Sequence, residues 1–365
     1  MGRGPPALFR VIDTGLRDGR RQVAFDQAMI EARKAGTIGD TIRFLRFPPT
    51  VLVGRHQDLS REVRVDHCRA HGIGLARRIT GGGAIYFDEG QLGWSLVFDR
   101  ASLGIVSLPE LAAALCEAAA AGLRRLGVDA RFRPRNDIEV DGRKLGGSGG
   151  FFDGDTIFFQ GTVLVDLDPR RMVAALRVPE AKLARHGLDS AASRVATLEA
   201  LLGSAPPLAQ VREALLAGFA ERLGIATAWG AIEAHEDALA ARLHEAEIGT
   251  DAFVAEIDDP DPEGTALSGS CTGPGGTVTA YLRLEGPRRE RIREALLTGD
   301  FFVTPPRTVL DLEASLRGVA TREARQAIER HFATAQVGLL SVTPADFAAA
   351  IEAAIGDGGQ NVARG

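Results

Sequence analysis

The sequence predicts an α+β protein of two domains, and three observations lead to this expectation. Short strand-like runs alternate with glycine-rich turns through the first half of the chain, and helix-forming sequence dominates from about residue 169 to residue 247. An acidic, proline-rich segment, DDPDPE at 258–263, then precedes a further strand and several helices. We therefore expect a first domain at 1–257, a linker at 258–263, a second domain at 264–358 and a loose tail at 359–365.

Hydrophobic periodicity and turn residues predict the individual elements. Apolar residues recur with helical spacing at 23–35 and at 107–127, where Ser107 is a natural N-cap. In the second domain, residues 278–285 alternate apolar and polar, which predicts a strand, and helices are predicted at 287–297, 308–316, 321–333 and 344–355. The strands predicted in the first domain are 41–47, 51–54, 75–78, 84–87, 92–98, 137–140, 156–159 and 162–165.

The composition argues against several classes of protein. The chain has 365 residues, is 45% hydrophobic and 25% charged, and carries a net charge of −5, so we expect it to fold and not to bind nucleic acid. Its three cysteines lie far apart and form no C-x-x-C pair, which argues against a disulfide framework or a zinc ribbon and indicates a reducing cytoplasm. No apolar run is long enough to cross a membrane, and no coiled-coil heptad is present, so we expect a cytoplasmic monomer.

Residues 77–86, RRITGGGAIY, combine two arginines with three glycines at the end of a predicted strand. Backbone without Cβ atoms lets a ligand approach the N–H groups of a turn, and arginine adds donors that suit phosphate or carboxylate. This segment, which we call the glycine loop, predicts an anion site; the alternative is a hairpin turn with two surface arginines. It is neither a P-loop nor a Rossmann fingerprint, because G-x-x-x-x-G-K-[ST] and a helix-opening G-x-G-x-x-G are both missing.

A second segment, NDIEVDGRKLGGSGG at 136–150, predicts a hairpin that turns at Asp141 and Gly142. We call it the lysine hairpin. Lys144 begins the returning strand and is expected to lie across from Asp137. An ammonium group there can neutralise a phosphate or a developing oxyanion, and Asp137 can orient it or share a magnesium ion. The alternative is an exposed hairpin with a surface salt bridge.

Together, the two segments resemble the lipoate-protein ligase A family of the biotin/lipoate ligase superfamily. The shared pattern is R-R-x-T/S-G-G-G-A-x-Y followed, about 50 residues later, by N-D-x-x-V-x-G-R-K-x-x-G-S. LVGRHQ at 52–57, QGT at 160–162 and SRVATL at 193–198 add to it, and residues 275–318 resemble the small accessory domain found with these ligases. The resemblance implies a class II synthetase-like catalytic domain, with a mixed sheet flanked by helices, and a fused α+β accessory domain.

The resemblance also implies an activity and a site. Enzymes of this family use ATP to convert lipoate to lipoyl-AMP and then acylate a lysine of a carrier: an E2 or H-protein lipoyl domain, or a lipoate-binding protein of sulfur oxidation. Lys144 is implied as the catalytic lysine, in contact with both substrates, and Asp137 as a ligand of Mg²⁺. The implied adenylate positions are Arg78, Gly83, Ala84, Ile85, Tyr86, Asn136, Asp137 and Lys144. The implied lipoate positions are Arg77, Gly81, Gly82, Trp94, Lys144, Ser148, Gly161 and Thr162, with Leu96 and Phe98 as further candidate walls.

The chain departs from the family pattern at positions expected near the acyl chain and the acceptor. The family's H-D-x-G-N, H-H-G-T and G-S-A are here FDEGQ at 87–91, FQGT at 159–162 and GSG at 147–149. Three alternatives stay open. One is an octanoyltransferase of the same fold, which needs a nucleophilic cysteine near the lysine hairpin, where residues 131–143 have none. The others are a biotin ligase, which would carry a G-R-G-R-type loop, and a lipoate- or adenylate-binding protein without catalysis.

Overall fold

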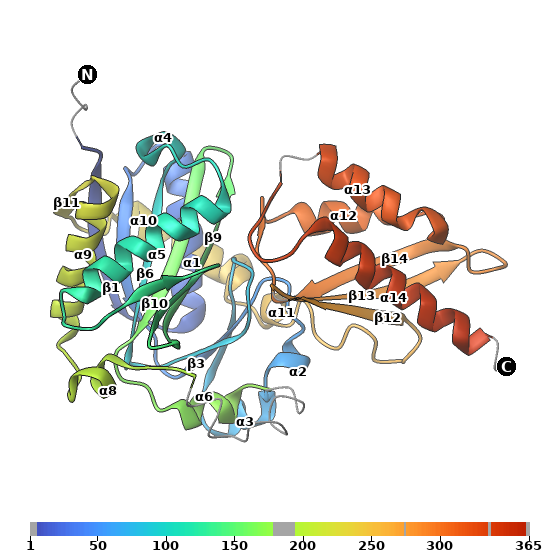
Figure 1. Ribbon diagram of the computed structural model, residues 1–365, viewed down its shortest axis with the longest axis horizontal. Helices are drawn as coiled ribbons and strands as arrows, with labels where there is room; N and C mark the ends of the chain where they lie inside the picture. The colour runs from blue at the N-terminus through green and yellow to red at the C-terminus, as the bar shows by residue number, and fades with distance from the viewer. Residues whose placement is uncertain (1–5, 178–193, 274, 335–336, 363–365) are drawn as a thin grey trace.

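The computed structural model describes residues 6–177, 194–273, 275–334 and 337–362, the side chains of 357–362 excepted. Figure 1 shows two bodies side by side: a large one built on a wide sheet, and a smaller one, in orange and red, that carries the C-terminus. The chain passes from the first to the second between α11 (Asp251–Val254) and β12 (Leu267–Gly273), across the predicted linker. None of the helices in the described part of the chain is long and apolar enough to span a bilayer.

The larger body is built on an eight-stranded mixed sheet. Strand β1 pairs in parallel with both of its neighbours, and every other neighbouring pair is antiparallel. The α+β fold with a mixed sheet is therefore confirmed. In order across the sheet, the strands are β11 (Ala226–Trp229), β1 (Leu8–Leu16), β2 (Thr41–Arg46), β6 (Gln91–Asp99), β10 (Thr156–Leu164), β9 (Arg143–Asp153), β8 (Asp137–Val140) and β7 (Arg131–Arg133).

Helices cover both faces of this sheet (Figure 1). Helices α5 and α9 pack on one face, where Gly122 and Gly218 allow close contact: a Cβ at either would lie 2.3 Å from a backbone oxygen of the other helix. Ser107 caps α5 as predicted, since its side chain accepts a hydrogen bond from Glu110 N at 3.3 Å. Helices α1 and α10 pack on the opposite face. The helices of this body are α1 (Gly19–Lys34), α2 (Leu59–Glu62), α3 (Val65–Ala70), α4 (Arg100–Leu103), α5 (Leu108–Arg124), α6 (Pro169–Ala175), α8 (Leu198–Leu202), α9 (Leu208–Leu223), α10 (Ala234–Leu243), a π-helical turn (His244–Ile248) and α11.

A three-stranded sheet beside the large one carries the glycine loop. Its central strand β3 (Thr50–Val53) is parallel to β4 (Gly74–Arg77) and antiparallel to β5 (Ile85–Phe87). The glycine loop connects β4 to β5, so strand pairing holds both of its ends. The other predicted segment, the hairpin of β8 and β9, turns at Asp141 and Gly142, both at positive φ (51° and 73°), as the Asp-Gly pair predicts.

The smaller body packs helices against an antiparallel sheet of β12, β13 (Gly276–Glu285) and β14 (Arg291–Gly299). The predicted strand at 278–285 is confirmed, but the helix predicted at 287–297 is wrong, because most of that segment forms β14. Pairing with β13 buries Ile292 and Leu297 completely, and this burial outweighs the helix propensity of the charged residues between them. The remaining elements are β15 (Val303–Thr304), α12 (Thr308–Leu316), a 3₁₀ turn (Thr321–Glu323), α13 (Ala324–Thr334), β16 (Gly338–Leu339) and α14 (Pro344–Val362).

Other elements differ from the sequence patterns in extent. The two strands predicted at 156–159 and 162–165 form the single strand β10, which ends at Leu164. Gly161 does not break this strand; it makes room for Trp94, because a Cβ there would lie 2.2 Å from Trp94 Cζ2. The patterns do not predict β1, β7, β11 and β12. Helix α14 continues past the predicted end at 355 to Val362, and residues 363–365 of the expected tail lie outside the described residues.

Glu313 of α12 gives the smaller body a pH-dependent stability. Its Oε1 accepts a hydrogen bond from Leu297 N at 2.7 Å. Burial outweighs this hydrogen bond and, with the nearby Glu256 carboxylate, raises the pKa of Glu313 from 4.5 to about 7. Between these values the folded protein keeps a proton that the unfolded chain has lost, so the free energy of unfolding falls as the pH rises through this window.

Glu313→Gln keeps the hydrogen-bond acceptor and removes the ionisation. We therefore expect this variant to be about 2 kcal/mol more stable than the parent at about pH 8, and close to it at about pH 5. Urea unfolding at the two pH values measures the difference, with the exposed Glu329→Gln as the control that should follow the parent. If the free energy of unfolding depends on pH in the same way in Glu313→Gln and in the parent, Glu313 is not the source of this pH dependence.

Candidate functional site

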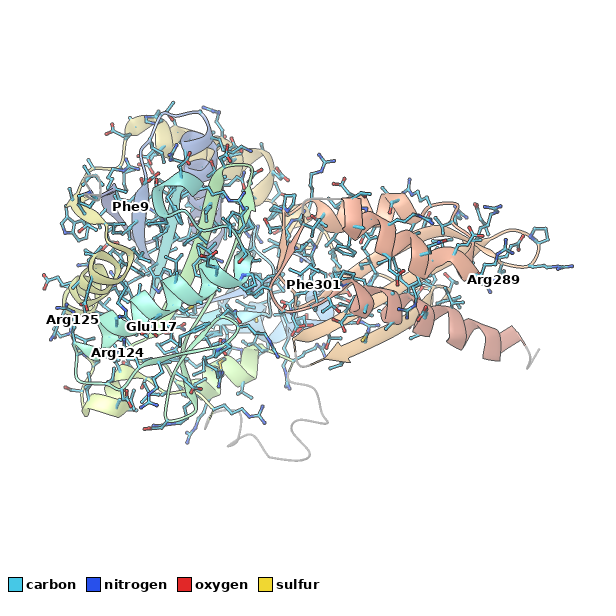
Figure 2. The ribbon with its side chains drawn as sticks, turned by 45° about the horizontal axis from the view of Figure 1, so that its top comes forward. Phe9, Glu117, Arg124, Arg125, Arg289 and Phe301 are labelled. Carbon is cyan, nitrogen blue, oxygen red and sulfur yellow. The ribbon has the colours of Figure 1, made fainter. Side chains whose placement is uncertain are left out.

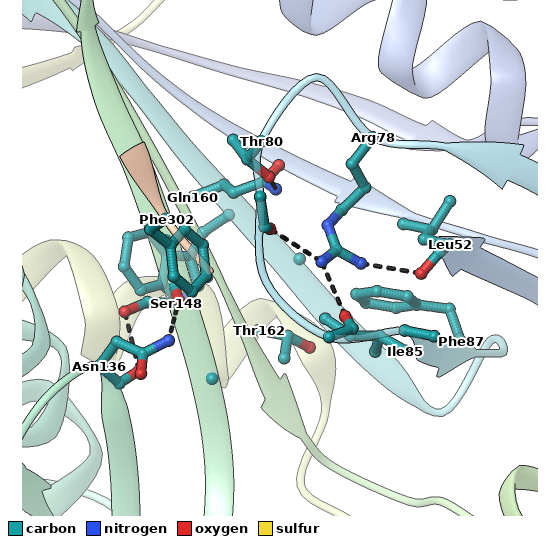
Figure 3. Close-up of a pocket in the computed structure, with 18 of the residues that line it drawn as sticks. Leu52, Arg78, Thr80, Ile85, Phe87, Asn136, Ser148, Gln160, Thr162 and Phe302 are labelled. Atoms are coloured by element: carbon teal, nitrogen blue, oxygen red, sulfur yellow. Dashed lines mark hydrogen bonds between the residues drawn. The ribbon is translucent and has the colours of Figure 1, made fainter. Parts of the chain in front are cut away.

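A cavity of about 170 Å³ lies between the glycine loop and the large sheet (Figure 3). It extends from the lysine hairpin to apolar residues of β2, β3 and β5. Asn136 and Ser148 lie on one side and Leu52 and Phe87 on the other, which suits a ligand with an anionic head and an apolar chain. The polar lining includes Arg78, Thr80, Asn136, Lys144, Gln160 and Thr162, and the apolar lining includes Leu45, Phe47, Leu52, Ile85, Phe87, Trp94 and Phe302.

The floor of the cavity is a row of residues that runs across the large sheet. Leu45 of β2 pairs with Gly93 of β6, Gly93 pairs with Thr162 of β10, and the same register places Thr162 beside Gly147 of β9. Residues paired in this way point to one face, and neighbouring strands lie about 4.8 Å apart. Gly147, Thr162 and Gly93 are small, so the row forms a groove over them. This groove is roughly 14 Å long and ends at Leu45.

Arg78 holds the glycine loop above this floor. Its guanidinium donates hydrogen bonds to the carbonyl oxygens of Leu52 (2.8 Å), Gly81 (3.1 Å) and Gly83 (2.8 Å), as Figure 3 shows. Burial lowers the pKa of Arg78 to about 10, so the side chain stays protonated at neutral pH. The loop carbonyls that this arginine engages are thus fixed, and the cavity has a rigid roof.

Two departures from the family pattern have a visible structural role. Gln160, where the pattern has histidine, donates from Nε2 to Thr80 Oγ1 at 2.7 Å and so ties the glycine loop to β10. Gly149, where the pattern has alanine, leaves space for the ring of Phe302 from the smaller body: a Cβ there would lie 2.0 Å from Phe302 Cε1.

Lys144 lies at the polar end of the cavity with its side chain 40% exposed. Its Nζ is 2.8 Å from Asp137 Oδ1, so the predicted meeting of these two residues is confirmed. The side chain folds back over Gly147, where a Cβ would lie 2.8 Å from Nζ. Residues of the SRVATL motif fix its backbone, because Lys144 N donates to Arg194 O (2.8 Å) and Ala196 N donates to Lys144 O (2.9 Å).

Asp137 orients the lysine and is itself held by a second cation. Its Oδ2 lies 2.5 Å from the Arg133 guanidinium, so one carboxylate contacts two positive groups. Burial opposes ionisation, but Lys144 and Arg133 together outweigh it and lower the pKa of Asp137 below its usual value. The carboxylate therefore stays charged and uses one of the three donors of the ammonium group.

Asn136 and Ser148 form a rigid pair beside the lysine. Ser148 N and Oγ both donate to Asn136 O at 2.9 Å, and Asn136 Nδ2 donates to Ser148 O (Figure 3). Behind them, Cys116 Sγ of α5 lies 3.0 Å from Ser148 Oγ. Cys116 is fully buried, lies outside the cavity lining, and has its pKa raised to about 12 by burial. Its thiol is therefore not available as a thiolate at neutral pH.

Most of the implied site residues lie together at this cavity. Ser193, the first residue of the SRVATL motif, lies outside the described residues. The implied site residues that lie in the cavity lining are Arg78, Gly81, Gly83, Ala84, Ile85, Trp94, Asn136, Lys144, Ser148, Gly161 and Thr162. Those outside the lining are Arg77, Gly82, Tyr86, Leu96, Phe98 and Asp137.

Arg77 and Tyr86 lie outside the lining because successive strand residues face opposite ways. Tyr86 sits between Ile85 and Phe87 on β5, and these two take the cavity side. Arg77 is fully buried next to Arg78 and points toward α11. Its guanidinium donates to six carbonyl oxygens, those of Gly54, Arg55, Gln57, Phe253, Val254 and Ile257.

Four apolar lining residues were not among the predicted site residues: Leu45, Phe47, Leu52 and Phe302. The first three lie on predicted strands, and their strand positions alone did not tell which face a ligand would use. Phe302 follows β14 in the other body, and no local pattern connects it to the glycine loop. Among the described residues, no group of three or more His, Cys, Asp or Glu could hold a metal ion.

Comparisons with known proteins identify the family of the chain. The model of the lipoyl protein ligase A/B catalytic domain matches residues 18–220. Octanoyltransferase LipM of Symbiobacterium thermophilum is 31% identical over 268 residues, which cover 67% of this chain and 96% of that protein. Lipoate-protein ligase LplJ of Bacillus subtilis is 32% identical over 168 residues, which cover 46% of this chain and 50% of that protein. Similar proteins thus carry both names.

Solved structures give the same result for the fold. A bi-partite lipoate protein ligase from Thermoplasma acidophilum, studied with its E2 lipoyl domain, is 28% identical with a TM-score of 0.62 and covers 69% of this chain and 97% of its own. A lipoate-protein ligase A bound with ATP is 27% identical with a TM-score of 0.59, over 70% of this chain and all of its own. Plasmodium falciparum LipL1, in complex with lipoate, is 14% identical but has a TM-score of 0.71 over 91% of this chain and 95% of its own, so its fold extends into the smaller body.

Proposed function

Because the chain belongs to the lipoyl protein ligase A/B catalytic-domain family, we propose that it is an ATP-dependent lipoate-protein ligase. It would convert lipoate to lipoyl-AMP and transfer the lipoyl group to a lysine of a lipoyl carrier domain. One observation carries the proposal: the Lys144 ammonium stands at the head of a groove whose other end is apolar, beneath a glycine loop. An acid with a long apolar tail fits this arrangement, with its carboxylate at the lysine.

In the first step, a carboxylate oxygen attacks the α-phosphorus of ATP and the bond to pyrophosphate breaks. Both reactants are anions, so a fixed cation between them lowers the repulsion and stabilises the charge that develops. Lys144 supplies this cation, and Asp137 holds it in place from the side away from the ligand. Gly83 lets the ligands lie against the backbone of the loop, whereas the space over Gly81 is taken by the smaller body, since a Cβ there would lie 2.0 Å from Phe301 O.

In the second step, the amine of the carrier lysine attacks the acyl carbon and the bond to AMP breaks, while the amine proton passes to solvent. Lys144 stabilises the departing phosphate here as well. The similar Thermoplasma ligase was studied with its E2 lipoyl domain, and this pairing supports a lipoyl domain as the acceptor class. The monomeric state and the cytoplasmic location predicted from the sequence stay predictions.

Mg²⁺ would reach this site on the nucleotide. Asp137 is the implied ligand, but it already contacts Lys144 and Arg133. Mg²⁺ at nucleotide sites is commonly held by one or two carboxylates together with the substrate phosphates. The residues present therefore fit an ion that ATP carries and that the phosphates mainly hold, with Asp137 as the implied carboxylate; among the described residues no cluster of three or more His, Cys, Asp or Glu forms a metal site of its own.

An octanoyltransferase is the second candidate, because several similar proteins carry that name. A transfer through a thioester needs a reactive thiolate in the cavity. Cys116 is the cysteine that lies beside the Lys144 hairpin, and its burial, raised pKa and position outside the lining argue against this role. These observations favour the ligase.

Cys116→Ser is expected to keep the acyl-transfer activity of the parent within about twofold, because a hydroxyl can replace the hydrogen bond to Ser148 Oγ while it cannot act as the thiolate. Transfer of octanoyl groups to a lipoyl domain, followed by mass spectrometry, measures this. Cys68→Ser, at a buried thiol far along the chain, is the matched control. Complete loss of transfer in Cys116→Ser alone would favour the octanoyltransferase.

The ligase itself is tested by incubating the full chain with ATP, Mg²⁺, lipoate and a set of lipoyl domains. The expected results are lipoate-dependent release of pyrophosphate and a gain in carrier mass equal to one lipoyl group. Transfer from an octanoyl carrier without ATP would instead support the octanoyltransferase. Tight lipoate binding without pyrophosphate release would support a binding protein without catalysis.

A further inference from the structure

The smaller body contributes a side chain to the cavity of the larger one. Phe302 is 8% exposed and lies in the cavity lining. Its ring is held between the glycine loop and β9, since a Cβ at Gly82 would lie 2.4 Å from Phe302 Cζ and one at Gly149 would lie 2.0 Å from Cε1. Figure 3 draws this ring with Asn136 and Ser148, across the cavity from Leu52 and Phe87. Two glycines thus leave the space that one phenylalanine fills.

The ring stands at the lysine end of the groove. Gly147 and Gly149 are two residues apart on β9, so their positions lie on one face of the strand, about 6.6 Å apart. Lys144 Nζ occupies the space over Gly147, and the ring of Phe302 occupies the space over Gly149. The aromatic ring is therefore next to the ammonium group, and it walls the side of the groove where the carboxyl head of an acid would lie.

Backbone and hydroxyl hydrogen bonds hold this wall in place. Gly82 N donates to Phe301 O at 3.0 Å, immediately before the ring, and Figure 2 shows Phe301 where the two bodies meet. Two residues after it, Thr304 Oγ1 accepts from Phe152 N and donates to Phe152 O, both at 2.7 Å. Because the segment is fixed on both sides of the ring, the wall does not yield easily to a wider ligand.

We propose that Phe302 is a specificity-determining residue: it narrows the groove beside Lys144, so that the site takes straight-chain carboxylic acids and rejects acids that branch next to the carboxyl group. The inference rests on the proposed function, which places the carboxyl head at Lys144. The roof is fixed by Arg78 and the floor by backbone, so the ring closes the side of the groove that a methyl branch near the head would enter.

The test compares octanoate with 2-methyloctanoate, which carries one extra methyl group on the carbon next to the carboxyl. Calorimetry on the full chain gives the ratio of the two dissociation constants for the parent, Phe302→Ala and Phe302→Leu. The parent should prefer octanoate, and Phe302→Ala should reduce that preference by about tenfold or more, since one methyl group in a close-fitting pocket changes discrimination by roughly 10- to 200-fold. Phe302→Leu should lie between them.

Phe332→Ala is the matched control, because it removes a phenylalanine of the same body outside the cavity lining and should keep the parent ratio. Thermal unfolding shows which variants are folded. If folded Phe302→Ala keeps the parent ratio of dissociation constants, the proposal is overturned. If Phe302→Ala does not fold, an unchanged ratio in Phe302→Leu overturns it instead.

Exchange of pyrophosphate into ATP, measured with the same acids, separates this proposal from the ligase assignment. If the ratio of the two dissociation constants depends on Phe302 but neither acid stimulates pyrophosphate exchange, the specificity role is supported and the ligase assignment is contradicted. Acid-dependent exchange with a ratio that ignores Phe302 supports the ligase and contradicts the specificity role. A parent that binds neither acid contradicts both.

Discussion

Lys144→Ala is expected to lower the rate of lipoate-dependent pyrophosphate exchange into ATP by about a hundred- to a thousandfold while the protein stays folded. The lysine supplies the positive charge where two anions must meet, and an alanine leaves that repulsion uncompensated. The fold should change little, because the side chain is 40% exposed and its ion pair with Asp137 is of a kind that contributes about 1 kcal/mol or less. Arg133 still contacts Asp137 in the variant.

Lys34→Ala is the matched control for this experiment. Lys34 Nζ lies 2.6 Å from Asp153, with the lysine 47% and the aspartate 37% exposed, so it forms a comparable ion pair away from the cavity. Its removal should leave exchange unchanged. Lys144→Arg keeps the charge but presents a planar fork in place of a compact ammonium, so it should recover only part of the rate. Full exchange in Lys144→Ala would refute the ligase assignment and favour a surface salt bridge.

Arg77→Ala is expected to lower the free energy of unfolding by about 3–5 kcal/mol, the largest stability loss that we expect from a single substitution here. The guanidinium is fully buried and serves six carbonyl oxygens from the segment after β3 and from the end of α11, and alanine would leave these acceptors without their donor. Burial lowers the pKa of Arg77 to about 10, so the native state holds a charged donor at neutral pH.

Urea unfolding measures this loss, and the KM for lipoate separates it from a role in binding. Folded Arg77→Ala should keep the parent KM, since the side chain lies outside the cavity lining. Arg20→Ala is the control: Arg20 also bonds backbone carbonyls of this region, but it is 25% exposed and should cost about 1 kcal/mol. A raised KM with unchanged stability would restore Arg77 to the lipoate-binding residues.

The sequence predicted well those features that depend on near neighbours. Asp141 and Gly142 define a tight turn by their own backbone preferences, and that turn brings Lys144 to Asp137. Ser107 caps α5 for an equally local reason. The glycine loop and the lysine hairpin together predicted one site, and both lie at one cavity.

The rest depends on contacts between distant parts of the chain. Arg77 ends β4 and Arg78 follows it, and their side chains point in different directions; only the position of α11 decides which of them is buried away from the cavity. The segment of β14 has helix-forming residues, but it gains more by pairing with β13. Phe302 reaches the cavity from another body, so the spacing of residues around it carries no sign of that contact.

The contact of Thr304 with Phe152 has a consequence for self-association. Beyond its pairing with β8, β9 runs along the border of the large sheet, and a hydroxyl there satisfies one N–H and one C=O as a neighbouring strand would. An open border flanked by Phe151 and Phe152 is a template onto which a second molecule can add a strand. The smaller body covers this part of the border, and we expect the larger body produced without it to form more insoluble material.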